Sequence, residues 1–396
     1  MESQYRRIWA KAEKSPVLMR SNEYIQAKLF QPDLNVLVME MGPNCNLACF
    51  HCSVNCGPDR EGTPSLDVMM KAAYGAINAG VPYFSLTLGE PLREENRAVL
   101  EPVAACSGVF STCFVTNGTF AITYDSAVEW LRYLKKIGFN FSPGLTHFDV
   151  SLGRMYPNSL EQCENVLRAV KKELPNNPGR NVSFSHVGSS DEEDFTRVNG
   201  LLAIIEQIFG KRRHEHVRQY RDELKIFCYP KEGPSIRVDM APIRPWGRAS
   251  ELAYFDKVAP RMKLGPKDLS IPFSDGADFV VFHNGDVCFS DCTGELERKI
   301  VYGNVNEQLR KILERIRADV FFQGYKLGGD ALLYYVAQKL EPGFVVEGRT
   351  KHDVRKAIFD SVSLVKGIRK YLLHEGVVDV YKEYINGVDM TRADLV

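Results

Sequence analysis

The feature that most constrains the fold is a regular alternation of short apolar segments with amphipathic ones. Six apolar segments have the character of β-strands, at 35–41, 83–88, 112–116, 146–152, 181–187 and 235–241. Segments with helical periodicity lie between them, at 65–79, 93–105, 124–137, 159–173 and 192–209. Strands that alternate with helices form right-handed βαβ units, whose strands pair in parallel. The pattern therefore predicts an α/β fold, a partial (β/α)6 TIM-like barrel that stays open.

The chain divides by sequence character into three predicted parts. Residues 1–33 indicate an N-terminal helical cap with a break at a proline, and 34–250 hold the alternating pattern. The third part, 251–396, is expected to form a small β-hairpin and a helical extension. Its hairpin, at 279–289, has Asn284-Gly285 as a type I′ turn pair. A further strand at 300–302 and helices at 306–317, 331–339 and 352–373 complete this expectation.

One charged stretch interrupts the alternation at 211–233. It opens with Lys-Arg-Arg-His-Glu-His, and acidic residues interleave with the basic ones. A contact with nucleic acid and a solvated helix face are both compatible with this pattern. Because aromatic residues are sparse here, we favour the helix face.

The charge balance excludes several classes of function. The 396 residues contain 50 basic and 50 acidic side chains, so no overall field attracts nucleic acid or a membrane surface. No apolar stretch approaches the length of a membrane span, and the N-terminus lacks the apolar core of a signal peptide. Ten cysteines without a regular framework indicate reactive or metal-bound thiols rather than a disulfide scaffold. We therefore expect a cytoplasmic protein without membrane or nucleic-acid partners.

The first predicted strand leads into the run Cys45-Asn-Leu-Ala-Cys49-Phe-His-Cys52. In α/β sheets and barrels the chemistry lies at the carboxyl ends of the strands, which is where this C-x3-C-x2-C loop follows. Three thiolates at this spacing can bind three irons of a [4Fe–4S] cluster and leave the fourth iron open, whereas such clusters usually have four cysteine ligands. A structural zinc site that adds Cys56 or His51 as a donor is the alternative.

Polar residues also follow the next three strands. Thr87-Leu-Gly-Glu-Pro-Leu ends the second strand and Thr116-Asn-Gly ends the third. Ser151 lies at the end of the fourth, and strand alternation places His147 and Asp149 on the same face as this serine. Arg237 and Asp239 likewise share a face of the sixth strand. These four charged or titratable residues would either contact substrate or form internal ion pairs.

The order of these motifs resembles the radical S-adenosylmethionine (radical SAM) family, across about residues 35–305. The resemblance implies that Cys45, Cys49 and Cys52 bind the [4Fe–4S] cluster, whose open iron is filled by S-adenosyl-L-methionine. It also implies cofactor-binding roles for further residues: His51 near the adenine, Gly89, Glu90 and Pro91 at the amino group, Asn117 along the pocket, and Ser151 at the ribose. Leu88 stands where the family's motif has its first glycine, which puts close backbone approach there in doubt.

Two later segments resemble the C-terminal extensions called SPASM or twitch. They are Pro245-Trp-Gly-Arg-Ala and the stretch from His283 to Cys292, followed by Gly303-Asn-Val. Such extensions usually bind one or two additional clusters. No cysteine follows Cys292, so a full two-cluster extension is excluded. A second Fe–S cluster at Cys288 and Cys292, with Cys228 or another ligand, stays open as an alternative.

The resemblance implies an enzyme that cleaves S-adenosylmethionine reductively and abstracts hydrogen from a substrate. We expect an electron donor of the flavodoxin or ferredoxin type as partner. A peptide is the favoured substrate, as in ribosomal peptide maturation. The alternatives are a small molecule or nucleoside in antibiotic or cofactor biosynthesis and, from another class, a non-catalytic Fe–S or zinc protein.

Overall fold

The computed structural model describes most of the chain and divides it into two compact units. Described residues are 21–30, 34–50, 52, 54–153, 159–174, 181–188, 192–210, 215–220, 223–228, 236–242, 261–265, 269, 278–290, 300–348 and 351–387. The first unit, called here the α/β unit, comprises Val36–Ala249 and Val280–Asp286. The second, called here the helical unit, comprises Met1–Asn35, Ser250–Phe279 and Val287–Val396.

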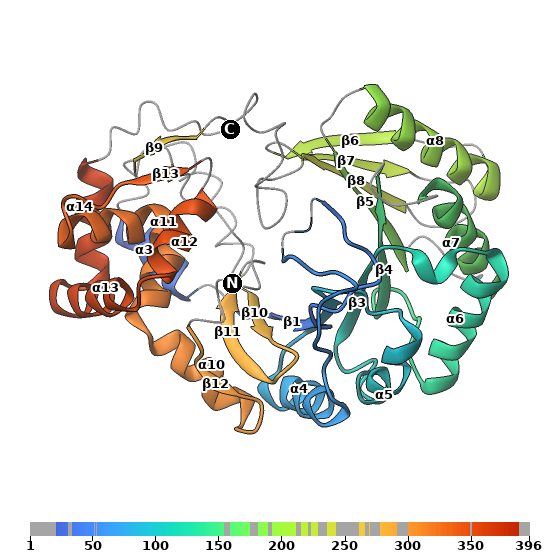
Figure 1. Ribbon diagram of the computed structural model, residues 1–396, viewed down its shortest axis with the longest axis horizontal. Helices are drawn as coiled ribbons and strands as arrows, with labels where there is room; N and C mark the ends of the chain where they lie inside the picture. The colour runs from blue at the N-terminus through green and yellow to red at the C-terminus, as the bar shows by residue number, and fades with distance from the viewer. Residues whose placement is uncertain are drawn as a thin grey trace. The chain divides into compact units, whose positions relative to one another are not determined.

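Six parallel strands form the centre of the α/β unit (Figure 1). They are β1 (Val36–Glu40), β2 (Tyr83–Thr87), β3 (Ser111–Thr116), β4 (Thr146–Leu152), β5 (Val182–Gly188) and β8 (Ile236–Pro242). Each begins and ends within one residue of its predicted bounds, and each pairs in parallel with the next. No pairing joins β1 to β8 in the described part of the chain. The predicted α/β class with an open parallel sheet is confirmed.

Helices cover one face of this sheet, as Figure 1 shows. They are α4 (Leu66–Ala79), α5 (Arg97–Ala105), α6 (Tyr124–Ile137), α7 (Ser159–Glu173) and α8 (Glu192–Phe209), with short 3-10 turns at Glu94–Asn96 (η1) and Thr119–Ala121 (η2). Local signals set their ends. The Ser65 hydroxyl accepts from the Val68 amide at the start of α4, and Gly80, at φ 70°, ends that helix. Between sheet and helices, Phe114 stacks on Phe148 in a buried aromatic core.

The charged stretch at 211–233 is not a helix where the structure describes it. It forms two strands, β6 (Glu215–Tyr220) and β7 (Glu223–Cys228), which pair with each other and with β8 in antiparallel register. The expected helix face is therefore wrong. Strands β6 and β7 lie at the end of the strand order, where polar side chains are common and weaken a hydrophobic pattern.

The predicted hairpin is present, but its turn differs from the expected type. Strands β10 (Asp278–Val281) and β11 (Asp286–Ser290) flank it. The Gly285 amide donates to Phe282 O and the Phe282 amide to Asp286 O. Only Gly285 has positive φ, at 88°, whereas a type I′ turn needs positive φ at both central residues. The connection is a three-residue loop closed by a glycine bulge.

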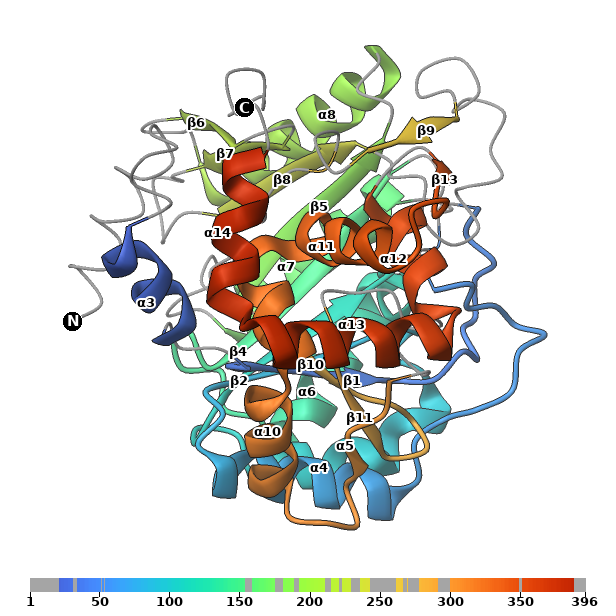
Figure 2. The same cartoon turned by 90° about the vertical axis from the view of Figure 1, so that its left-hand side faces the viewer.

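The helical unit consists mainly of five C-terminal helices, grouped in Figure 2. Its elements are α3 (Asn22–Phe30), β9 (Met262–Leu264), β12 (Gly303–Asn304), α10 (Leu309–Ala318), α11 (Val320–Leu340), β13 (Val346–Gly348), α12 (Lys351–Phe359), α13 (Val362–Glu375) and α14 (Val377–Gly387). Helix α11 extends well before the predicted 331–339, and the predicted helix 352–373 is two helices. The strand expected at 300–302 is displaced to β12.

Buried polar contacts stabilise this helical unit. Helix α11 breaks at Gly329, where φ is 61° and ψ is −153°, a conformation open only to glycine. The next residue, Asp330, binds Arg355 of α12 through two contacts of 2.8 and 2.7 Å, with both side chains almost fully buried. The glycine break thus places a carboxylate where it can compensate a buried guanidinium.

Candidate functional site

The sequence-predicted residues meet in one pocket of about 190 Å³ in the α/β unit. It lies where β1 to β4 end, at the carboxyl edge of the sheet. Its lining includes Cys45, Cys49, Cys52, Val54, Cys56, Thr87, Leu88, Gly89, Glu90, Thr116, Asn117 and Ser151. Residues separated by more than a hundred positions in the sequence therefore share one pocket, as the strand-end argument predicts.

The cysteine loop is closed at its base by backbone hydrogen bonds. The Cys45 amide donates to Gly57 O at 3.1 Å, and the Gly57 amide donates to Pro43 O at 2.9 Å. Within the loop, the Cys52 amide donates to Cys49 O at 3.1 Å. Cys45 is buried and Cys49 and Cys52 are half-buried, and none of the three is in a disulfide. The loop is thus a closed structure that presents three thiols to one pocket.

These three thiols fit an iron–sulfur cluster. Thiolates are the ligands of such clusters, and the three lie on the wall of a pocket rather than in a packed core. Burial raises the pKa of the Cys45 thiol, an effect that positive metal ions would oppose. Among the described residues, no three cysteine, histidine or acidic side chains are grouped so as to hold a single metal ion.

Cys56 lies behind the loop and contacts Cys52. Its amide donates to Cys52 Sγ at 3.3 Å, and its thiol lies 3.8 Å from Gly42 O. The side-chain hydrogen bond with Cys52, followed by burial, raises the pKa of the Cys56 thiol. In this geometry Cys56 acts as a hydrogen-bond donor to the predicted cluster ligand Cys52.

Glu90 is a buried carboxylate with three donors. Its Oε1 accepts from the Leu92 amide at 2.9 Å and the Thr116 hydroxyl at 2.7 Å, while Oε2 accepts from the Asn117 amide at 2.7 Å. Burial nevertheless raises the pKa of Glu90 to about 7, because desolvation outweighs these three hydrogen bonds. A cation placed in the pocket would be the missing counter-charge. The amino group of S-adenosylmethionine is such a cation.

Leu88 and Gly89 give the turn before Glu90 an unusual backbone. Leu88 has φ of 54°, in the left-handed region where a branched side chain costs roughly 1–2 kcal/mol. Gly89 has φ of 125°, and a Cβ there would lie 2.3 Å from Gly42 O. The turn therefore packs against Gly42, in the segment between β1 and the cysteine loop. Leu88, which stands where the family's motif has a glycine, thus has a backbone conformation that glycine adopts at lower cost.

Asn46, which the sequence argument did not single out, joins the cysteine loop to the end of β3. Its Nδ2 donates to the Thr119 hydroxyl at 2.7 Å, and its Oδ1 accepts from Asn117 Nδ2 at 2.9 Å. Asn117 Oδ1 in turn accepts from the Thr119 hydroxyl at 2.7 Å, which closes a three-residue ring. The only sequence signal was the position of Asn46 directly after Cys45.

A second connection runs from Arg93 to the residue before Cys45. Arg93 Nη1 donates to both the backbone and side-chain oxygens of Asn44, at 2.9 and 2.8 Å. On the same turn, Asn96 Nδ2 donates to the backbone oxygen of Glu90 at 2.9 Å, and both Asn96 and Pro91 are buried. The loop that carries the cysteines is thus held at two points, Asn44 and Asn46.

Beyond Ser151, polar side chains continue across the sheet on the face opposite helices α4 to α8. His147 Nε2 lies 2.7 Å from Ser183 Oγ, and Asp149 accepts from the hydroxyls of Ser183 and Ser185 at 3.0 and 2.8 Å. Register places Ser151 beside Ser185, which itself pairs with a residue of β8. His147, Asp149 and Ser151 therefore share one face, as strand alternation predicts.

Arg237 and Asp239 of β8 complete this polar row. They form an ion pair of 3.0 Å between Nε and Oδ2, and Arg237 Nη2 lies 3.5 Å from Ser183 Oγ. Arg237 keeps 43% of its side chain exposed. Of the two readings left open by the sequence, the ion pair is present, and contact with substrate stays a prediction.

A further buried carboxylate, Glu40, lies at the end of β1. It accepts from both the amide and Nδ1 of His283, at 3.0 and 2.6 Å. The same histidine is close to Gly62, where a Cβ would lie 2.7 Å from its Nε2. His283 thus anchors the hairpin turn beside the segment that follows the cysteine loop.

Three predicted elements lie outside the described residues: His51, the run 245–249 and Cys292. Cys288 is described on β11 as a buried cysteine that is not in a disulfide, and the second-cluster hypothesis stays a prediction. No helix among the described residues is long and apolar enough to cross a membrane.

Comparison with known proteins gives a family. Residues 39–198 match the model of the radical SAM superfamily. No curated protein matches the chain. The chain is similar to three solved structures at low identity: BtrN in complex with AdoMet and 2-DOIA (13% identity, 76% of this chain and 90% of that chain, TM-score 0.39), anSMEcpe with bound AdoMet (15%, 76% and 84%, 0.41), and Streptococcus suis SuiB bound to precursor peptide SuiA (13%, 71% and 64%, 0.38).

The chain thus has a radical SAM domain at residues 39–198, which contain the cysteine loop, the Glu90 turn and Ser151. It is therefore an S-adenosylmethionine-dependent enzyme. The family implies a [4Fe–4S] cluster, a reductant and a substrate.

Proposed function

We propose that the protein is a radical SAM enzyme that abstracts hydrogen from a peptide, as in ribosomal peptide maturation. When bound at Cys45, Cys49 and Cys52, the [4Fe–4S] cluster supplies the electron that cleaves S-adenosylmethionine to methionine and a 5′-deoxyadenosyl radical. The observation that carries the proposal is the single pocket shared by these cysteines, Glu90 and Ser151.

The chain's own residues would hold the cofactor in the productive position. Glu90 would accept the amino group of S-adenosylmethionine in a charge-assisted hydrogen bond, and Ser151 would contact the ribose. Asn46 and Arg93 hold the cysteine loop against the turns that carry Asn117 and Glu90. Such fixed geometry favours a reactive radical because it limits which C–H bond comes within reach.

Sequence supports the peptide as substrate. The stretch from His283 to Cys292 and the following Gly303-Asn-Val resemble extensions of peptide-modifying members of the family. The peptide assignment rests on this resemblance together with the size of the extension.

A small-molecule substrate is the second candidate, and the polar row on β4, β5 and β8 favours it. Asp149, Arg237 and Asp239 line the same face as Ser151 together with two serine hydroxyls. Such partly exposed charges suit a compact polar ligand such as an amino or carboxyl compound.

A fractionation experiment distinguishes the two substrates. The reconstituted protein is incubated with dithionite, S-adenosylmethionine and extract of its native cells, and the substrate-dependent increase in 5′-deoxyadenosine is measured. Extract is divided into a high-mass fraction, the same fraction after protease, and a low-mass filtrate. A protease-sensitive increase supports the peptide. An increase confined to the low-mass filtrate and resistant to protease contradicts it and favours the small molecule.

A further inference from the structure

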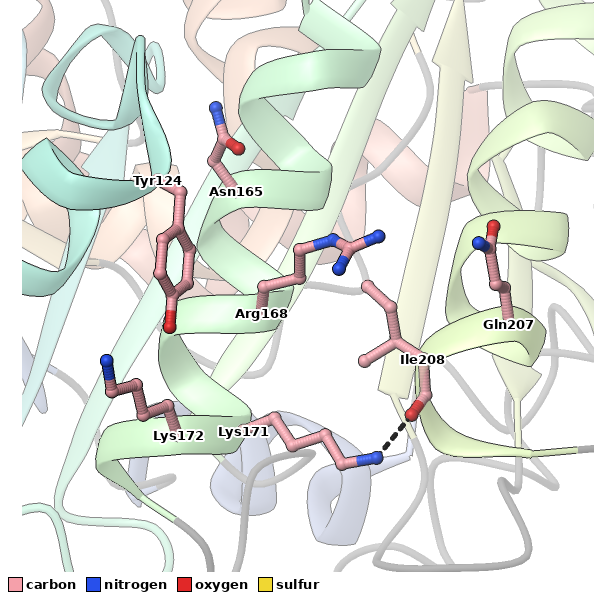
Figure 3. Close-up of a pocket in the computed structure, with 7 residues that line it drawn as sticks. All are labelled: Tyr124, Asn165, Arg168, Lys171, Lys172, Gln207 and Ile208. Carbon is pink, nitrogen blue, oxygen red and sulfur yellow. Dashed lines mark hydrogen bonds between the residues drawn. The ribbon is translucent and has the colours of Figure 1, made fainter.

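A second pocket lies on the outer helical layer of the α/β unit, between α7 and α8 (Figure 3). Its volume is about 780 Å³, and we call it the basic groove. It is lined by Tyr124, Asn165, Arg168, Lys171, Lys172, Gln207 and Ile208. Three of these seven side chains are cationic and none is acidic. Because the whole chain has no net charge, this is a local concentration of positive charge.

The cations of the groove are only partly neutralised. Arg168 pairs with Glu164 one turn earlier on the same helix, at 2.6 Å. Lys171 donates to the backbone oxygen of Ile208, as the dashed line in Figure 3 shows. Lys172 lies over the ring of Tyr124, 5.4 Å from its centroid, and has no carboxylate partner among the described residues. Exposed Arg168 and Lys172 therefore keep attraction for an external anion.

The neighbouring face of α6 extends this positive surface. Arg132 and Lys135 share one carboxylate, Glu173 at the end of α7, at 3.0 and 3.6 Å. Lys136, the next residue, is exposed. Helices α6 and α7 together carry six cations and five carboxylates, so the positive charge is concentrated at the groove and the adjoining end of α6 rather than along both helices. Such a surface raises the encounter rate with an acidic protein and makes association depend on salt.

The groove is connected to the cysteine loop by hydrogen bonds. At one end, Asn165 Nδ2 donates to the backbone oxygen of Ala121 at 3.0 Å. Ala121 ends the short turn η2, which begins at Thr119. The Thr119 hydroxyl accepts from Asn46, the residue directly after Cys45. Two hydrogen bonds and three consecutive residues therefore join the groove to the loop that carries the predicted cluster ligands.

We propose that the basic groove is the docking surface for a small acidic one-electron carrier protein of the flavodoxin or ferredoxin class. This inference rests on the proposed function, because only a redox centre at the cysteine loop needs such a partner. The carrier is oxidised by one electron and the cluster is reduced by one, with no other group consumed. Charge complementarity selects the acidic partner, and the Asn165–Thr119–Asn46 connection explains why this face, among the outer helices, suits electron entry.

The test reverses the charge of two groove residues that make no backbone contact. The variant R168E/K172E is compared with R168Q/K172Q, which only neutralises the charge, and with K366E. Lys366 is an exposed lysine of α13 in the helical unit and serves as the matched control. Circular dichroism and thermal unfolding confirm that each variant is folded. The probe is a reduced flavodoxin, and dithionite is the small-molecule reductant that needs no docking surface.

Two readouts are measured for each variant. The first is the affinity of flavodoxin for cluster-free protein, by titration calorimetry at low and high salt. The second is 5′-deoxyadenosine formation by the reconstituted protein, driven by flavodoxin or by dithionite. We expect reversal to weaken flavodoxin binding by roughly tenfold or more at low salt, with a smaller effect of neutralisation. Flavodoxin-driven cleavage should fall in parallel, while dithionite-driven cleavage stays unchanged.

Several results would overturn the docking proposal. They are unchanged flavodoxin affinity in R168E/K172E, an equal loss in K366E, or an equal loss of dithionite-driven cleavage. The last result would indicate that the substitutions disturb the cofactor site itself rather than the docking of a carrier. Absence of dithionite-driven cleavage by the unaltered protein would instead contradict the proposed function, so the two failures are distinguishable.

Discussion

Replacement of Glu90 by glutamine tests the cofactor site most sharply. The carboxylate is buried, its three hydrogen-bond donors are all uncharged, and the pocket beside it contains the cysteines. A hydrogen bond between charged partners contributes about 1.5–3 kcal/mol. Glu90→Gln removes the negative charge but keeps the size of the side chain. We therefore expect the Kd of S-adenosylmethionine to rise roughly 10- to 150-fold, which is this energy expressed as an equilibrium ratio.

The pH dependence gives the same prediction a second signature. Burial raises the pKa of Glu90 to about 7 in the unliganded protein. Only the ionised carboxylate attracts the ammonium group, so affinity is complete above this pKa. As pH falls below about 7, affinity should fall by up to tenfold per unit, because the ligand must displace a proton. Glu90→Gln has no proton to lose and should show no such pH dependence.

The assay is equilibrium binding of S-adenosylmethionine to anaerobically reconstituted protein, from about pH 5.5 to about pH 8.5. Glu95→Gln is the matched control, because this carboxylate lies on the same turn but is exposed and pairs with Arg93 at the surface. Equal affinity of Glu90→Gln and the unaltered protein would refute the assignment. A pH profile that persists unchanged in Glu90→Gln would show that another group titrates.

Three further predictions concern the framework. Gly89→Ala should abolish cofactor binding, since its Cβ would meet Gly42 O and φ is 125°; normal binding by calorimetry would contradict this. Burial lowers the pKa of His186 below its ordinary value of 6.5, so the unfolded chain binds a proton at a higher pH than the folded protein does. The free energy of unfolding should therefore decrease as pH falls below 6.5, and a urea midpoint that does not change over this range would contradict the prediction. Arg355→Met leaves the Asp330 carboxylate buried and uncompensated, and should cost about 3–5 kcal/mol in urea unfolding, whereas a loss below about 1 kcal/mol would show that the carboxylate finds another partner.

The parallel core could be predicted because each strand is an apolar segment between helices with clear start and stop signals. Ser65 and Gly80, for example, bound α4 in sequence as they do in the structure. The pair β6 and β7 could not be predicted in this way. Their charged residues alternate at the end of the sheet, where burial no longer imposes a pattern.

The turn of the β10–β11 hairpin shows a second reason why sequence alone does not predict a local conformation. The pair Asn284-Gly285 favours positive φ at both positions, but the contacts of the preceding residue, His283, determine which turn forms. Glu40 binds both the amide and the ring of His283, which makes His283 and Asn284 the central pair and leaves Gly285 to form the bulge. A contact across more than two hundred residues thus determines a local conformation that short-range preference cannot predict.

The candidate site also contains residues that the sequence predicts and residues that it does not. Glu90, Asn117 and Ser151 were predictable because each ends a strand, and parallel strands bring their carboxyl ends to one edge. Asn46 and Arg93 were not, because their roles depend on specific distances to Thr119 and Asn44 rather than on a strand position. Leu88 departs from the motif and has a positive φ of 54°, a conformation that glycine adopts at lower cost.

The most direct test of the central claim is a joint measurement of iron and 5′-deoxyadenosine on anaerobically reconstituted protein. The account predicts about four irons per chain and 5′-deoxyadenosine formation with dithionite and S-adenosylmethionine. Both should be lost in alanine variants of Cys45, Cys49 and Cys52, and the iron should be kept in Cys56→Ala. About eight irons would indicate a second cluster. Absence of iron, bound zinc, or iron without S-adenosylmethionine cleavage would contradict the radical SAM assignment of the site.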